Sequence, residues 1–388
     1  MSSTRPAPVP YPTGARPSHP DINTLLHGSP RQVPVTLVLV GINVTVFVLM
    51  LFAGASLWQG DSRIQLAWGA SFGPATQDGQ WWRLFTAMFL HFGIAHLGLN
   101  MWALWDVGRL VERLLGRWQF ALLFLGSATA ANLLSLAVNG GNAICAGASG
   151  GVFSLYGALL VFLWRERRQV DPAEFRRLLM VAGGFTAVSL AMGFVIAGID
   201  NAAHVGGLVC GALLTPALAR PWSAQSPPVS PLRWLPMGLL AAAIAFIVAR
   251  LPAPDYRLSD ELRAQAAIRQ FLADDRRLSE SWGSILSAKE RDGVTFEQLA
   301  GRIESRVGAG YQENFEQLSA LRLDPAAPSA PALEELRRYA ALRGDASQAL
   351  AEGLRKQDPV KVRKALESAR MAPALAHRAS SPQPGASR

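Results

Sequence analysis

Long uncharged runs of apolar residues dominate the chain between Val35 and Val248, and short clusters of charged residues separate them. A helix needs about 20 apolar residues to cross the ~30 Å hydrocarbon core of a bilayer. Seven stretches meet or approach this length, namely residues 35–58, 84–105, 118–138, 148–164, 178–199, 202–219 and 235–248. The pattern predicts an all-α fold, a polytopic membrane helix bundle with seven spans at residues 34–251. In the second span we expect the helix to begin near Ile94.

The two flanking regions have a different composition. Residues 1–33 contain seven prolines and no apolar run, which predicts a disordered tail and no signal peptide. Residues 252–375 are rich in Ala, Leu, Arg and Glu, with apolar residues at helical spacing and a linker at residues 324–331. We therefore expect a small extracytoplasmic α-helical domain there, followed by a disordered tail at residues 376–388.

The arginines are unevenly divided between the two sets of connections. One set carries most of them, namely Arg5, Arg16, Arg31, Arg109, Arg113, Arg117, Arg165, Arg167, Arg168, Arg176, Arg177, Arg220 and Arg233. Because cytoplasmic loops carry the excess of positive charge, the N-terminus is predicted to be cytoplasmic. With seven spans the C-terminal domain is then extracytoplasmic, and the expected location is a bacterial inner (cytoplasmic) membrane.

Composition removes several other classes of function. The net charge of +9 lies in loops and in the mixed-charge C-terminal third, without a basic stripe and interleaved aromatics, so no nucleic acid partner is expected. Cys145 and Cys210 provide neither a disulfide framework nor a metal site. A His-Glu-x-x-His motif is absent from the sequence, which argues against a metalloprotease. No cofactor and no metal are therefore expected.

Polar residues are costly inside a bilayer and often functional. His96 and Asn100 are four residues apart, so they share one face of the second span. A hydrogen bond between packed helices would also explain them. His91 precedes this helix, near the interface, where a structural hydrogen bond is the expected role.

Ser149 stands among small residues at the start of the fourth span. Gly147, Gly150 and Gly151 leave space beside it, and the free N–H groups of a helix start favour negative charge. This environment suits a developing oxyanion. The alternative is a helix-packing motif of small residues, because Gly147-x-x-x-Gly151 has that form.

His204 lies near the start of the sixth span. Ala203, Gly207 and Gly211 stand at a spacing of four in this span and give a smooth face for close packing against the fourth span. Such packing would bring His204 to Ser149. A structural histidine is the alternative, and Asp200 is expected to cap the helix.

The predicted topology puts the starts of the second, fourth and sixth spans on the same outer side. Ser149, His204 and His96 are therefore expected at similar depth, near one water-accessible surface. Nucleophilic catalysis needs this combination of a hydroxyl, a base and donors for the oxyanion.

These residues carry a family resemblance. The pattern His91-x4-His96-x3-Asn100, then Gly147-Ala148-Ser149-Gly150, then Ala203-His204-x-x-Gly207, resembles the rhomboid intramembrane serine proteases. Trp82-Arg83 resembles the family's Trp-Arg motif, and residues 112–116 resemble its glutamate-containing motif. The resemblance covers about residues 80–215 and implies a six-helix core followed by a seventh, C-terminal span.

The resemblance implies a catalytic dyad of Ser149 as nucleophile and His204 as general base. His96 and Asn100, together with the backbone N–H of Ser149, would form the oxyanion hole. The same motifs imply supporting positions, which are His91, Gly147, Gly150, Phe153, Asn201, Gly207, Trp82 and Arg83. Phe153 departs from the family pattern, in which tyrosine often packs on the catalytic histidine, but a phenyl ring can still stack on His204.

The expected reaction is hydrolysis of a peptide bond in or near a transmembrane helix of another membrane protein. The loop around Trp82 would dip into the outer leaflet, and the fifth span with its loop to Asp200 would act as the substrate gate. The partners are thus transmembrane substrates and the lipid bilayer, with an envelope protein as a further partner for the C-terminal domain. The alternatives are a rhomboid-like pseudoprotease that binds membrane clients without cleavage and a transporter. The sequence shows no matching inverted halves for a transporter.

Overall fold

The structure is a computed structural model that describes residues 33–139, 143–167, 170–219, 231–288 and 293–372. The predicted disordered tails, apart from Val33, fall outside these residues. The chain divides into two compact units. The first, which we call the membrane unit, consists of Met1–Thr76 and Gln80–Pro252, and the second, the C-terminal unit, consists of Gln77–Gly79 and Ala253–Arg388.

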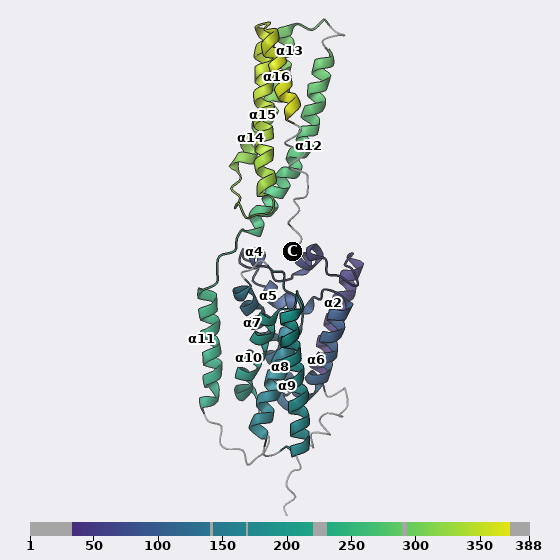
Figure 1. The fold of residues 1–388 in the computed structure, drawn as a ribbon, viewed down its shortest axis with the longest axis vertical. Helices are drawn as coiled ribbons and strands as arrows, with labels where there is room; N and C mark the ends of the chain where they lie inside the picture. Colours follow the sequence, from purple (N-terminus) through teal and green to yellow (C-terminus); the bar gives the residue numbers. More distant parts are fainter. Residues whose placement is uncertain (1–32, 140–142, 168–169, 220–230, 289–292, 373–388) are drawn as a thin grey trace, which may run out of the picture. The chain divides into compact units, whose positions relative to one another are not determined.

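The membrane unit is helical (Figure 1). Its helices are α2 (Pro34–Phe52), α3 (Ser62–Trp68), α4 (Gly73–Thr76), α5 (Arg83–Thr86), η2 (Ala87–Phe89), α6 (Ile94–Leu115), α7 (Arg117–Val138), α8 (Ser149–Glu166), α9 (Pro172–Val195), α10 (Asn201–Leu218), η3 (Pro231–Trp234) and α11 (Leu235–Ala249). Extended pairing in the described residues is limited to an isolated antiparallel bridge between Ser71 and Cys145. The predicted all-α class is therefore confirmed.

Five helices are long and apolar enough to cross a membrane: α2, α7, α9, α10 and the stretch Pro231–Ala249. Arg83–Phe89 and Ile94–Leu115 meet the same test together as a pair bent by 92°, which makes up to six among the described residues. The protein is thus a multi-pass membrane protein. Helix α8, the predicted fourth span, falls short of this test because serine and glycine open it and Arg165 and Glu166 close it.

Three helices have ends that differ from the predicted spans. Helix α2 ends at Phe52, well before Trp58, because Gly54 adopts a left-handed conformation (φ 97°) that terminates it. Helix α6 begins at Ile94 as predicted but continues to Leu115, and Gly116 (φ 86°) ends it. Helix α9 begins at Pro172, where the Asp171 carboxylate accepts hydrogen bonds from the first-turn N–H groups.

Helix α8 lies among α6, α7, α9 and α10 (Figure 1). Its approach to α10 is so close that backbone touches backbone. A Cβ at Gly207 would overlap the carbonyl of Gly150, and a Cβ at Gly211 would overlap that of Ser154. The small-residue packing predicted for these two helices is present, and it fixes how α8 and α10 are aligned along their lengths.

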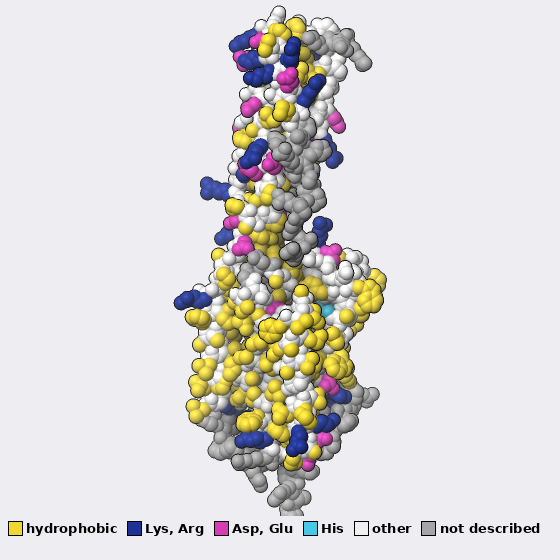
Figure 2. Space-filling model, viewed as in Figure 1, with side chains coloured by type: hydrophobic (Ala, Val, Ile, Leu, Met, Phe, Trp, Pro, Cys, Tyr) yellow, Lys and Arg dark blue, Asp and Glu magenta, His cyan; other side chains and the backbone are white. Residues whose placement is uncertain are grey.

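Large apolar side chains remain exposed on the outside of the membrane unit (Figure 2). Phe194 and Val195 of α9 are each 84% exposed, and α11 has no buried residue. Helices that are apolar over most of their surface belong in hydrocarbon. The exposed apolar surface is consistent with contact to lipid.

The C-terminal unit has its own helices: α12 (Leu258–Ala288), α13 (Phe296–Ile303), a π-helical turn η4 (Glu304–Gly308), α14 (Ala309–Ala320), α15 (Ala330–Arg355) and α16 (Pro359–Met371). Its core includes Phe271, Ile303, Tyr311 and Leu336. Helix α16 was absent from the sequence prediction. Its start follows Asp358, whose carboxylate accepts from the N–H groups of Val360 and Lys361.

Candidate active site

His96 and Asn100 lie on the first two turns of α6. The His96 Nδ1 accepts a hydrogen bond from the Phe92 N–H at 3.4 Å, so the proton of a neutral imidazole belongs on Nε2. Asn100 is buried, and its Nδ2 donates to the His96 carbonyl at 3.0 Å, which leaves the second N–H of the amide available. Both side chains can therefore act as donors.

Gly147 brings the start of α8 to the His96 ring. Its φ of 139° lies in the range that favours glycine. A Cβ on Gly147 would lie 3.0 Å from His96 Nε2 and 3.8 Å from Ser149 Oγ. The imidazole N–H and the serine hydroxyl therefore flank the same point, which only a residue without a side chain leaves open.

Ser149 is the first residue of α8 and is half-buried. The two glycines after it are closely covered. A Cβ at Gly150 would lie 2.8 Å from the Ala131 side chain, and a Cβ at Gly151 would lie 2.6 Å from the Phe124 ring. Larger residues there would push α8 away from α7 and displace Ser149.

His204 lies on the first turn of α10 and is 9% exposed. Its ring stacks on Phe153, with centroids 4.2 Å apart and planes 9° from parallel. Phe153 is one turn after Ser149 on α8, so the two share a face. Together with the Gly150–Gly207 contact, this stack sets His204 beside the end of α8 that carries Ser149. Within the described residues no hydrogen bond joins the two side chains, and His204 Nδ1 has no partner.

Asp200 caps α10, as predicted, by accepting from the Ala203 N–H at 3.0 Å. It also accepts from Ser135 Oγ, from Cys145 Sγ at 2.8 Å and from Asn139 Nδ2 at 3.4 Å. The Cys145 thiol is therefore a hydrogen-bond donor to the carboxylate that caps α10. Ser135 and Cys145 were missed because nothing in their local sequence indicates a carboxylate partner.

Two supporting residues predicted from the sequence have structural contacts. Asn201 Nδ2 donates to the Leu190 carbonyl at 3.1 Å, and its side chain fills the space beside Gly193, so it ties α10 to α9. The buried His91 ring meets His96 edge-on at a centroid distance of 4.9 Å. His91 therefore backs the imidazole of His96 from the side of the preceding loop.

Arg83 holds the loop before α6 together from inside. Its guanidinium donates to the carbonyls of Leu66 at 2.6 Å and Ala70 at 3.1 Å, and to Gln80. The Trp82 ring covers the guanidinium at 4.8 Å and leaves about half of its own surface exposed. Arg83 therefore organises the loop backbone, and Trp82 presents an aromatic surface.

Glu112 has a role that the sequence did not reveal. Its buried carboxylate accepts from the N–H groups of Val35 at 2.9 Å and Thr36 at 2.7 Å, and from the Thr36 hydroxyl at 2.7 Å. Helix α2 has no side-chain cap of its own. Glu112 therefore supplies the missing cap of α2 from the last turn of α6.

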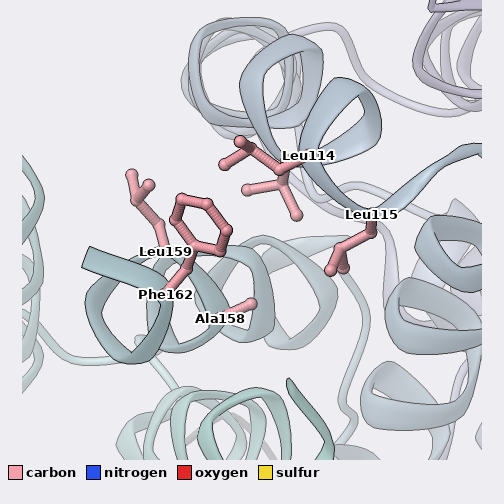
Figure 3. Close-up of a pocket in the computed structure, with 6 residues that line it drawn as sticks. Leu114, Leu115, Ala158, Leu159 and Phe162 are labelled. Atoms are coloured by element: carbon pink, nitrogen blue, oxygen red, sulfur yellow. The ribbon is translucent and has the colours of Figure 1, made fainter. Parts of the chain in front are cut away.

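The pocket drawn in Figure 3 is a different place. Its lining residues come from the second half of α6 and of α8, and all are apolar: Val111, Leu114, Leu115, Ala158, Leu159 and Phe162. Ala158 is nine residues beyond Ser149, about 13 Å along the helix axis. This pocket carries no group that could take part in catalysis. In the described part of the chain, no group of three or more His, Cys, Asp or Glu side chains is placed to hold a metal.

The fold and the site define a class: a polytopic membrane protein with a serine at the start of a central helix and a histidine on the helix packed against it. Residues 78–221 match the family model of the Rhomboid domain. The rhomboid protease GluP of Bacillus subtilis (strain 168) is 32% identical over 186 residues, which are 48% of this chain and 35% of that protein. The putative rhomboid protease YdcA of the same organism is 31% identical over 138 residues, 36% of this chain and 67% of that protein. RHOMBOID-like protein 1 of Arabidopsis thaliana is 37% identical over 133 residues, 34% of this chain and 33% of that protein.

The chain belongs to the rhomboid family. The match spans about a third of the length of GluP and two thirds of that of YdcA.

Proposed function

We propose that this protein is an intramembrane serine endopeptidase that hydrolyses peptide bonds in or near transmembrane helices of other membrane proteins. The observation that carries the proposal is the stack of His204 on Phe153, one turn along α8 from Ser149. It supports a dyad in which the base is held against the helix that bears the nucleophile. The names of the relatives, rhomboid protease among them, support the same class of reaction.

In the proposed reaction Ser149 Oγ attacks the carbonyl carbon of the scissile bond while His204 takes the hydroxyl proton. His204 then gives that proton to the leaving amine. A water molecule, deprotonated by the same imidazole, attacks the acyl group, and the imidazolium returns the proton to Ser149 Oγ as the acid product leaves. A dyad without an aspartate is consistent with Asp200, whose carboxylate is engaged with α10, α7 and Cys145.

The oxyanion formed in this step needs donors that are in place beforehand. We assign this role to His96 Nε2, to the free N–H of the Asn100 amide and to the backbone N–H of Ser149. The open point at Gly147, between His96 and Ser149, supports this assignment, since a carbonyl oxygen of the substrate would need such space. The N-terminal end of α8 adds a partial positive charge.

We further propose that the substrate enters beside α9. This helix has few buried residues, Leu178, Ala182 and Thr186. It meets the centre of the bundle through Phe185, whose ring stacks on Tyr156 at 4.4 Å and contacts Phe153 at 6.2 Å and Trp102 at 6.3 Å. A helix with so few buried residues can move outward at modest cost.

We also propose a membrane orientation, which rests on the distribution of the arginines. The N-terminus would be cytoplasmic in a bacterial inner membrane and the C-terminal unit extracytoplasmic. Water would then reach Ser149 from the outside. For the C-terminal unit we retain, as a proposal, binding of a membrane client or an envelope protein.

Cleavage of a model transmembrane substrate by the purified full-length chain in detergent tests the proposed function. We expect two fragments from the wild type and none from Ser149→Ala or His204→Ala. If the wild type binds the substrate but leaves it intact under conditions that retain the fold, the pseudoprotease alternative holds instead.

A further inference from the structure

We propose that Asp200, Cys145 and Ser135 form a positioning cluster that sets the geometry of the dyad. The cluster would hold the segment that leads to Ser149 against the helix start that carries His204. The inference rests on the proposed function, because it assigns residues to the reaction proposed above. None of these side chains would touch the substrate, so we call them positioning residues.

Asp200 controls the first turn of α10. Its carboxylate accepts from the Ala203 N–H at 3.0 Å, and its backbone carbonyl accepts from the His204 N–H at 3.1 Å. The backbone of His204 is thus hydrogen-bonded directly to Asp200. Because the Nδ1 of His204 has no partner in the described residues, the position of the imidazole depends on this turn and on Phe153.

Cys145 controls the approach to Ser149. Its backbone pairs with Ser71 in both directions, at 3.0 and 2.8 Å, and the Gly147 N–H two residues later donates to the Ala87 carbonyl at 2.9 Å. The segment before Ser149 is therefore fixed to the loop between α2 and α6. From this fixed position the Cys145 thiol donates to Asp200 Oδ2 at 2.8 Å.

Ser135 completes the cluster from the last turn of α7. Its hydroxyl donates to Asp200 Oδ2 and lies 2.9 Å from Cys145 Sγ. A helix cap requires one acceptor, and Asp200 already provides it with Oδ1. The second oxygen is used to join α7 and the segment before Ser149 to the start of α10. That second function is what the cluster adds to capping.

The chemistry of the thiol suits a permanent donor. Burial, and then the neighbouring Asp200, raise the pKa of the Cys145 thiol to about 12, so it keeps its proton at neutral pH. The neutral S–H is therefore a lasting donor to the Asp200 carboxylate.

The test compares kcat and KM for a model transmembrane substrate with the full-length chain in detergent. Because misplacement by about 1 Å can cost roughly 100-fold in rate, we expect Cys145→Ala to lower kcat by about 10- to 100-fold with KM nearly unchanged. Cys145→Ser, which retains a donor, should recover most of that loss. Asp200→Asn, which can still cap the helix, should lower kcat similarly.

Cys210→Ala is the matched control, since Cys210 lies on α10 with a buried side chain outside this cluster. Its kcat should stay within about twofold of wild type, as for a substitution away from the site. An unchanged kcat in Cys145→Ala overturns the proposal, and so does a loss that Cys145→Ser does not recover. The rate at which a fluorophosphonate labels Ser149 distinguishes failure of the positioning cluster from failure of the proposed function. If Cys145→Ala is labelled as fast as an active wild type, the cluster has no positioning role. If the wild type neither cleaves nor is labelled, the proposed function is wrong, and the positioning role that depends on it is wrong as well.

Discussion

The Phe153 ring stacks on the His204 imidazole, with an angle of 9° between the ring planes and 4.2 Å between the centroids. This contact joins α8, one turn after Ser149, to the first turn of α10. It also replaces an orienting hydrogen bond, because His204 Nδ1 has no partner among the described residues. The base of the proposed dyad is therefore positioned by stacking and by the helix backbone.

Replacing the ring tests this role. Phe153→Leu should lower kcat/KM by about 2- to 10-fold, since an aromatic pair contributes roughly 0.5–1.5 kcal/mol beyond area burial. Phe153→Tyr keeps the stack and should retain wild-type activity or exceed it. The measurement is substrate cleavage by the purified variants. A leucine variant as active as wild type would show that stacking does not position His204.

The proposed oxyanion donors predict a larger effect. His96→Ala and Asn100→Ala should each reduce kcat by about 100- to 1,000-fold, which is typical of losing one such donor. Thr129→Ala is a matched control, because Thr129 makes the same bond to the carbonyl four residues earlier, on α7. Its kcat should be unchanged. Equal kcat for Asn100→Ala and Thr129→Ala would show that Asn100 is not an oxyanion donor.

The contact between α8 and α10 predicts an effect on stability. Gly207→Ala places a Cβ against the Gly150 carbonyl and should destabilise the fold by about 1–3 kcal/mol through overpacking. Gly126→Ala on α7 has open space around the new Cβ and should be neutral or stabilising. Thermal unfolding in detergent compares the two. The same unfolding temperature for both variants would contradict the close approach.

The cap that Glu112 gives to α2 can be tested in the same way. Glu112→Gln keeps one acceptor but turns an amide N–H₂ toward the N–H groups of α2, so we expect a loss of about 1–3 kcal/mol. Hydrogen exchange at Val35 and Thr36 should become faster. Glu174→Gln, which removes an exposed ion pair with Arg177, should cost less than about 0.5 kcal/mol. Unchanged exchange at Thr36 would argue against the cap.

Local patterns predicted a large part of this architecture. Hydropathy identified the apolar segments, and the start of α6 near Ile94 was predicted from the unusual polarity that His91, His96 and Asn100 give to its span. The spacing of Gly207 and Gly211 predicted a close helix contact, which is present. Such features depend on periodicity along one segment, so a sequence can reveal them.

Other features depend on segments far apart in the chain. In the last turn of α6 the buried Glu112 finds its donors on α2, more than 70 residues away. The cap by Asp200 was readable from its position before α10, but its bond to Cys145 spans 55 residues. No local signal distinguishes these partners from ordinary polar residues, and only the folded chain brings them together.

The central claim is that Ser149 is a nucleophile activated by His204. The most direct measurement is mass spectrometry of the full-length chain after treatment with a fluorophosphonate, with the adduct located by peptide mapping. The account predicts one adduct, on Ser149, that is lost in Ser149→Ala and forms far more slowly in His204→Ala. An unmodified Ser149 in folded protein, or an adduct that forms equally fast without His204, would contradict it.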